Sequence, residues 1–111
     1  MKLVDLVIDA LEKAKASDII KYDLEGASPF FDHIILATAE TTTRAMGALS
    51  YLEDNLKDTE YKIRGIEGEY TEWLLIDLND VVVSILSKKE RENFELEKLY
   101  SIYKNQRIEN K

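Results

Sequence analysis

The chain has 111 residues, of which 45% are hydrophobic and 33% charged, and its formal net charge is −7. This length fits one domain with a core of its own. The sequence contains no cysteine, which excludes a disulfide framework, cysteine-based zinc sites and thiol chemistry. The negative charge disfavours broad binding to nucleic acid and suits a basic protein partner, although acidity can also serve solubility alone.

The first predicted element is a helix, because apolar residues recur with helical spacing over residues 3–14. Residues 20–24 alternate between apolar and charged, which predicts a half-buried strand. Residues 25–29 contain Gly, Ser and Pro and are typical of a turn. The nearly continuous apolar run over 30–37 then predicts a strand covered on both faces.

A second helix is expected over residues 45–56, where leucines and an alanine follow helical spacing and three threonines precede the segment. Residues 61–66 form a short predicted strand. Two apolar runs, 73–78 and 81–86, predict buried strands. Asn79-Asp80 between them is typical of a two-residue hairpin turn, since Asn and Asp tolerate positive φ better than most residues.

The last predicted element is a helix that begins after Ser87, which with Glu90 matches a capping box. Its apolar stripe consists of Leu96, Leu99, Tyr100 and Tyr103. We expect a single domain over residues 1–104 and a frayed tail over 105–111. The expected order is α-β-β-α-β-β-β-α. The predicted fold class is therefore α/β (α+β), a mixed and roughly five-stranded sheet flanked by helices.

Charge is distributed unevenly along the chain. Residues 1–87 carry 8 Lys/Arg against 17 Asp/Glu, a balance of −9, whereas residues 88–111 carry 7 against 5, a balance of +2. No apolar run approaches the roughly 20 residues needed to span a membrane. The acidic N-terminal segment resembles neither a signal peptide nor a transit peptide. We therefore expect a cytoplasmic protein that contacts neither DNA nor a membrane.

Catalytic motifs are scarce, because the sequence contains no phosphate-binding loop, zinc-protease motif or nucleophile elbow. A Ser-His-Asp triad can be drawn from Ser28, His33 and Asp32, but nearness in sequence does not establish its geometry. Nucleotidyltransferases place an Asp-x-Asp pair on a strand to bind two metal ions, with a third acid nearby. Here Asp32 matches the first acid and Asp77 could be the third, but Ile34 occupies the second position. We predict no catalysis, no cofactor and no metal.

Several aromatic and charged residues allow two interpretations. Trp73 starts a predicted strand and could be either a core residue or an interface anchor, since tryptophan is enriched at binding hot spots. Tyr100 and Tyr103 lie on the last helical stripe and are expected in the core. Arg91 and Glu95 have the spacing of a surface ion pair on one helix.

Three motifs occur in order along the second half of the chain. They are Gly-x-Glu-Gly at 65–68, Trp-x-x-x-Asp-x-x-Asp-Val at 73–81 and Arg-x-x-Phe-x-Leu-Glu-x-Leu-Tyr at 91–100. Together they make the chain resemble the ribosome silencing factor, or Iojap-like, family, and the resemblance extends over about residues 4–103. The resemblance implies a nucleotidyltransferase-like fold that lacks the active site.

The resemblance also implies a function. Members bind the large ribosomal subunit through the conserved large-subunit protein numbered fourteen, at the face that meets the small subunit. Bound there they sterically block subunit joining, which lowers translation, and members are also linked to large-subunit assembly. Many form homodimers when free. The acidic domain would be steered to a basic ribosomal protein.

We expect six residues to contact the partner or to support the contact. The aromatic members would act as anchors, the acids would face basic groups, and the arginine would orient the last helix. The set is Trp73, Asp77, Asp80, Arg91, Phe94 and Tyr100. Two other functions stay open: a residual nucleotidyltransferase or nucleotide-binding domain, and a generic dimeric scaffold.

Overall fold

The computed structural model describes residues 2–108 and contains four helices and six strands over that range. In chain order the elements are α1 (Lys2–Lys13), β1 (Ser17–Asp23), β2 (His33–Thr38), α2 (Thr42–Leu56), β3 (Gly65–Glu67), β4 (Trp73–Asp77), β5 (Val81–Leu86), α3 (Lys88–Phe94), α4 (Leu96–Leu99) and β6 (Lys104–Ile108). No helix within residues 2–108 combines the length and the apolar character that crossing a membrane requires.

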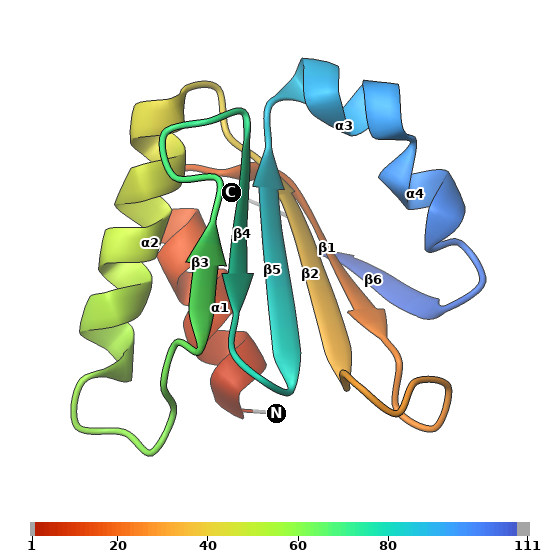
Figure 1. Ribbon diagram of the computed structural model, residues 1–111, viewed down its shortest axis with the longest axis horizontal. Coiled ribbons are helices and arrows are strands. Elements are labelled where there is room, and N and C mark those ends of the chain that lie inside the picture. The colour runs from red at the N-terminus through yellow and green to blue at the C-terminus, as the bar shows by residue number, and fades with distance from the viewer. Residues whose placement is uncertain (1, 109–111) are drawn as a thin grey trace.

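All six strands form one sheet in the order β3-β4-β5-β2-β1-β6. The central pair, β2 and β5, is parallel, and the other pairs are antiparallel. Figure 1 shows the chain returning at its end to place β6 beside β1. Every residue of β2 is buried, which confirms the prediction of a strand covered on both faces for residues 33–37, whereas Phe30, at the start of the predicted strand, lies before β2 and is 78% exposed.

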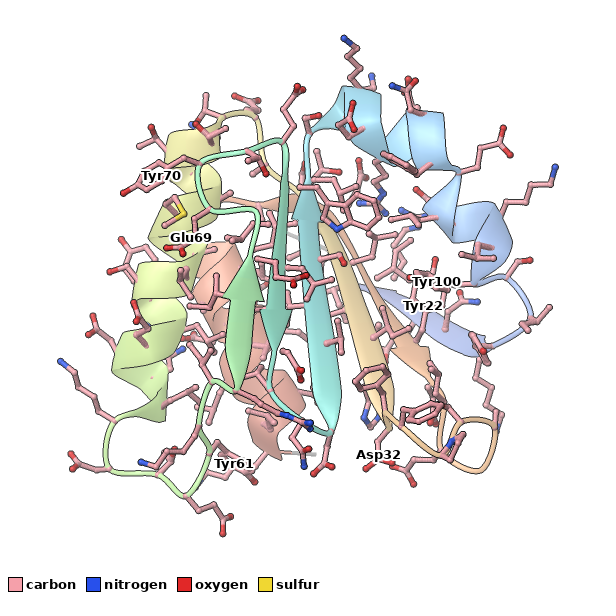
Figure 2. All side chains as sticks on the ribbon, viewed as in Figure 1. Tyr22, Asp32, Tyr61, Glu69, Tyr70 and Tyr100 are labelled. Atoms are coloured by element: carbon pink, nitrogen blue, oxygen red, sulfur yellow. The ribbon has the colours of Figure 1, made fainter. Side chains whose placement is uncertain are left out.

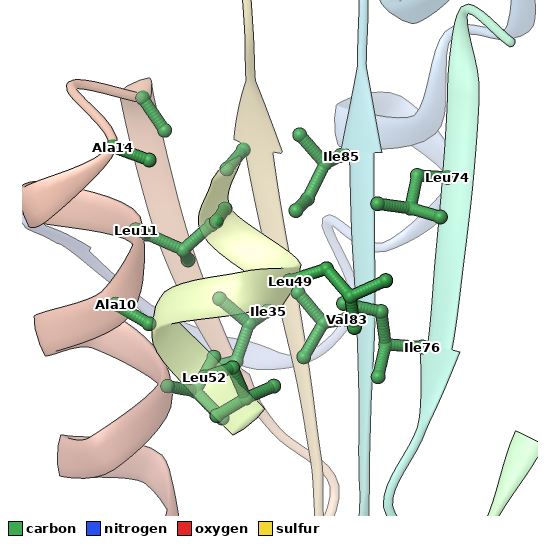
Figure 3. Packing of buried hydrophobic residues seen from close by; sticks show 14 of the residues in the cluster. Ala10, Leu11, Ala14, Ile35, Leu49, Leu52, Leu74, Ile76, Val83 and Ile85 are labelled. Atoms are coloured by element: carbon green, nitrogen blue, oxygen red, sulfur yellow. The ribbon is translucent and has the colours of Figure 1, made fainter. Parts of the chain in front are cut away.

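One face of the sheet is covered by α1 and α2, which lie side by side (Figure 1). The helical stripes predicted from the sequence supply this core: Leu11 of α1 and Leu49 and Leu52 of α2 pack on Ile35, Val83 and other strand residues (Figure 3). Leu74 and Ile76 of β4 belong to the same cluster. This cluster is the larger of the two hydrophobic cores.

The opposite face carries a smaller core beneath α3 and α4. Its buried members come from β1, β2, β5 and α4 and include Leu24, which directly follows β1. Trp73, Tyr100 and Tyr103 pack against it while staying half-buried. The two tyrosines thus lie at the margin of the core that the sequence predicted for them. Figure 1 shows that α3 and α4 stand over β1, β2 and the end of β5 and do not extend across β3 and β4.

The predicted fold class is confirmed, and so are its main local signals. Asn79 has a φ of 75° in the β4–β5 turn. Thr41 caps α2 by accepting a hydrogen bond from the Arg44 backbone N–H at 3.1 Å. Ser87 caps α3 by accepting one from the Glu90 N–H at 3.1 Å. The reciprocal half of the capping box does not form, because the Ser87 N–H donates to the Glu72 backbone oxygen instead.

Two predictions for the end of the chain are wrong. The expected single last helix is two short helices, since Glu95 adopts a left-handed conformation with a φ of 48° and ends α3. The expected frayed tail is ordered over residues 105–108, which pair with β1 as part of β6. Pairing satisfies the outer hydrogen-bonding groups of β1, which a frayed tail would have left open. Residues 109–111 of that predicted tail lie outside the described residues.

The loop from β3 to β4 depends on Gly68. Its φ is +76°, and a Cβ atom at this position would collide with the backbone oxygen of Trp73. Thr71 ties the same loop together, since its hydroxyl donates to the Gly68 backbone oxygen at 2.6 Å. Gly68 therefore fixes how the chain enters β4 at Trp73.

We predict that Gly68→Ala lowers the free energy of unfolding by about 2 kcal/mol or more, because it combines a left-handed alanine with a backbone collision. Gly47 in α2 is the matched control, since a Cβ there meets nothing within 4 Å. Gly47→Ala should raise stability by up to about 1 kcal/mol through helix propensity. Urea denaturation of both variants measures the difference, and equal effects would contradict it.

Candidate docking surface

The part of the sheet that α3 and α4 leave uncovered forms a continuous strip, which we call the open strip. It consists of Trp73, Leu75 and Asp77 of β4 and Val82 of β5. Alternation along β4 places the first three on one face, and the register pairs Asp77 with Val82. All four side chains are half-buried. A shallow hollow beside the strip is lined by Glu67, Gly68, Trp73 and Leu75.

Trp73 lies at the end of the open strip where β4 begins. Both interpretations from the sequence apply to it, because its side chain packs against the smaller core and is still half-buried. Its indole N–H donates to the Ser84 hydroxyl at 3.2 Å, which fixes the ring on the sheet. The other neighbour is Phe94 of α3, with ring centroids 4.9 Å apart and planes inclined by 58°. Phe94 is 52% exposed. The pair is thus an aromatic patch anchored to the core on one side and open to solvent on the other.

Arg91 is buried, and the prediction that it forms a surface ion pair with Glu95 is wrong. Its Nε donates to Glu97 Oε1 at 2.9 Å. Its Nη1 donates to the Asp18 backbone oxygen at 2.7 Å and to the Thr38 hydroxyl at 3.0 Å. The helix break at Glu95 turns α4 so that Glu97 faces this guanidinium. Arg91 therefore joins α3 and α4 to β1 and β2.

Tyr100 closes the lower side of α4 against the sheet. Its ring meets Tyr22 of β1 edge-on, with centroids 5.3 Å apart, and Figure 2 shows the two side chains next to each other. Burial raises the pKa of Tyr100 above its ordinary value, and the neighbouring Tyr103 adds to the increase. Burial likewise raises the pKa of Tyr22. The position of Tyr100 supports α4 and does not extend the open strip.

Asp77 and Asp80 lie at the turn end of β4 and β5, away from the aromatic pair. Asp77 accepts a hydrogen bond from the Asn79 N–H at 2.8 Å and so shapes the turn. Asp80 is exposed, and its backbone oxygen accepts from the N–H groups of Asp32 and His33. The structure therefore divides the six predicted residues: Trp73, Phe94 and Asp77 border or form the open strip, Arg91 and Tyr100 support the helices, and Asp80 lies in the turn.

Two strip residues, Leu75 and Val82, were not among the six predicted residues. The signal for Leu75 was present, because it is two residues from Trp73 and from Asp77 on one strand and must share their face. Val82 could be placed only with the β4–β5 register, which pairs it with Asp77.

The catalytic alternatives find little geometric support among residues 2–108. Ser28 Oγ accepts hydrogen bonds from the backbone N–H groups of Phe30 and Phe31, and His33 makes no side-chain hydrogen bond to it or to Asp32. Asp32, which is labelled in Figure 2, lies at the end of the sheet where β2 begins. Ile34 occupies the position of the second metal-binding acid and is buried in the smaller core. It pairs with Val82 of β5, which in turn pairs with Asp77 of β4.

Comparison with known proteins identifies a common family. A sequence model of the family described as "Ribosomal silencing factor during starvation" matches residues 1–111. The ribosomal silencing factor of Haemophilus influenzae is 29% identical over 102 residues, which cover 91% of this chain and 100% of that protein. The mouse protein named "Mitochondrial assembly of ribosomal large subunit protein 1" is 24% identical over 105 residues, 89% of this chain and 45% of that protein.

The fold has a solved counterpart as well. A crystal structure of a protein from Chromobacterium violaceum superposes with a TM-score of 0.83 at 32% sequence identity. The match covers 90% of this chain and 84% of that chain.

We predict that Arg91→Met lowers the free energy of unfolding by about 3 kcal/mol, because it leaves buried acceptors without their donor. Arg107 is the matched control, since it contacts the same Glu97 at 3.2 Å and Asp18 at 3.8 Å but its side chain is 56% exposed, against 6% for Arg91. Arg107→Met should cost less than about 1 kcal/mol. Urea denaturation distinguishes the two, and similar losses would show that burial does not set the cost.

Proposed function

The chain belongs to the ribosomal silencing factor family, whose role is ribosome-associated repression of translation, and we propose that it acts by occupying the large subunit. In this proposal it binds the conserved large-subunit protein numbered fourteen on the face that meets the small subunit. Its volume there prevents subunit joining, so that no turnover is needed. The mouse relative's name supports an additional role in large-subunit assembly.

The observation that carries the proposal is the open strip with its aromatic end. Trp73 and Phe94 offer an exposed apolar patch with one ring fixed by a hydrogen bond, which is typical of an interface anchor. The strip is bounded by acids, with Asp77 at its lower end and Glu67 beside its hollow. An apolar centre with an acidic border is complementary to a basic protein patch.

Charge also favours a protein surface over ribosomal RNA. Residues 1–87, which include the whole open strip, carry the excess of acidic groups, and such a surface is repelled by phosphate backbones. We further propose that the protein is cytoplasmic and forms a homodimer when free. The alternative is that the chain is a residual nucleotidyltransferase or nucleotide-binding domain. This function would require saturable binding of nucleoside triphosphate with Mg²⁺ and formation of a product.

We predict that the full chain sediments with purified large ribosomal subunits and lowers the yield of whole ribosomes when small subunits are added. Steric exclusion is the reason, because the docked protein would occupy the joining face. Sucrose-gradient profiles with and without the protein measure both effects, and small subunits alone are the control. Failure to sediment with large subunits, or normal joining around the bound protein, would refute the proposal.

We predict that Phe94→Ala and Trp73→Ala each weaken large-subunit binding by about 1–2 kcal/mol, as loss of an interface anchor does. Tyr51→Ala is the matched control, since Tyr51 is an exposed aromatic residue on α2, which covers the other face of the sheet. Its affinity should equal that of the wild type. Circular dichroism confirms that each variant is folded, and unchanged binding by both Phe94→Ala and Trp73→Ala would exclude this surface.

A further inference from the structure

Three potential metal ligands converge at the end of the β1–β2 hairpin, outside the open strip. They are Asp23 at the end of β1, Glu25 in the following turn and His33 at the start of β2. One ligand atom from each lies within 4.8 Å of the other two. We call this group the Asp23–Glu25–His33 cluster.

Backbone pairing holds the cluster in place. Asp23 and His33 are direct partners in the β1–β2 register, so their side chains leave the same face of the sheet. The His33 strand is also paired with β5 on its other side. Glu25 is tied to Asp23, because the Glu25 N–H donates to Asp23 Oδ1 at 3.0 Å. The donor atoms are therefore brought together by the fold.

The imidazole of His33 gives a second and independent reason to expect a ligand. His33 is only 7% exposed, and its Nδ1 is buried with no hydrogen-bond partner among residues 2–108. Buried side-chain nitrogens are nearly always bonded. The imidazole therefore has one ring nitrogen without a partner, and one of its ring nitrogens lies within 4.8 Å of carboxylate oxygens of Asp23 and Glu25, an arrangement that a cation can complete.

We propose that the Asp23–Glu25–His33 cluster binds a divalent transition-metal cation of the Zn²⁺ or Mn²⁺ class. One imidazole nitrogen with two carboxylate oxygens suits these ions, whereas Mg²⁺ and Ca²⁺ prefer oxygen ligands alone. Bonds of about 2.0–2.2 Å place ligand atoms about 3.3 Å apart around a tetrahedral ion. Glu25 is exposed and Asp23 half-buried, so their side chains can rotate to close that distance. Water completes the coordination shell.

This cluster differs from the positions of a nucleotidyltransferase centre. Those acids would stand at Asp32 and Ile34, and Ile34 points into the smaller core. His33 alternates with Ile34 and shares the face of Ile35, which belongs to the larger core under α1 and α2. The metal site is thus on the opposite face from the open strip and does not depend on ribosome binding. Its role is to fasten the turn over residues 24–32 to the sheet.

The test uses the full chain without a histidine tag, because His33 is the only histidine and its imidazole resonances are then unambiguous. Zn²⁺ titration followed by NMR should shift one set of imidazole signals with 1:1 saturation, and Mn²⁺ should broaden the same set. Zn²⁺ should also raise the melting temperature, since a ligand that binds only the folded state stabilises it, and EDTA should reverse the increase.

Variants locate the site without altering the buried imidazole. Asp23→Asn and Glu25→Gln should each weaken Zn²⁺ binding at least about 10-fold. Asp32→Asn is the matched control, because it removes the same charge from a residue adjacent to His33 that is outside the cluster, and its affinity should be that of the wild type. The proposal is overturned if the imidazole signals do not respond to millimolar Zn²⁺, if both cluster variants bind normally, or if Asp32→Asn weakens binding equally.

Discussion

The central parallel pair of strands imposes the main constraint on this fold. Every residue of β2 is buried, and β5 is buried at all positions except Val82. A strand of this kind needs a layer on each face. The helices α1 and α2 supply one layer with ordinary apolar stripes. The other layer consists of two short helices that together contribute one fully buried apolar residue, Leu96.

Arg91 compensates for that thin second layer. A buried guanidinium with three oxygen acceptors holds α3 and α4 over the sheet where apolar contacts are few. The layer reaches β4 only where Phe94 meets Trp73, and the rest of this face of β4 stays uncovered as part of the open strip. The same shortage of helix that makes Arg91 necessary therefore leaves a surface available for a partner. The thin layer of α3 and α4 thus accounts both for the role of Arg91 and for the surface that we propose for binding.

Periodic signals were sufficient to predict most elements, because amphipathic helices and the Asn79-Asp80 turn depend on near neighbours. Three features could not be predicted that way. Glu95 in a left-handed conformation has no local signal, since glutamate rarely adopts it. The segment Lys104–Ile108 is polar and lacks an apolar alternation, because it is an edge strand. Arg91 finds Asp18 and Thr38 at separations of 73 and 53 residues, which only the folded chain brings together.

The pairing of β6 with β1 also bears on how the molecule is made. The strand that covers the outer edge of β1 comes from residues 104–108 and follows all the other strands of the sheet in sequence. During synthesis β1 leaves the ribosome before β6, and its outer hydrogen-bonding groups stay open until residues 104–108 have also emerged. The sheet therefore cannot be completed on a nascent chain that lacks its last strand. Vectorial synthesis makes this edge the final part of the sheet to be sealed, and during that interval a chaperone or a neighbouring chain can reach it.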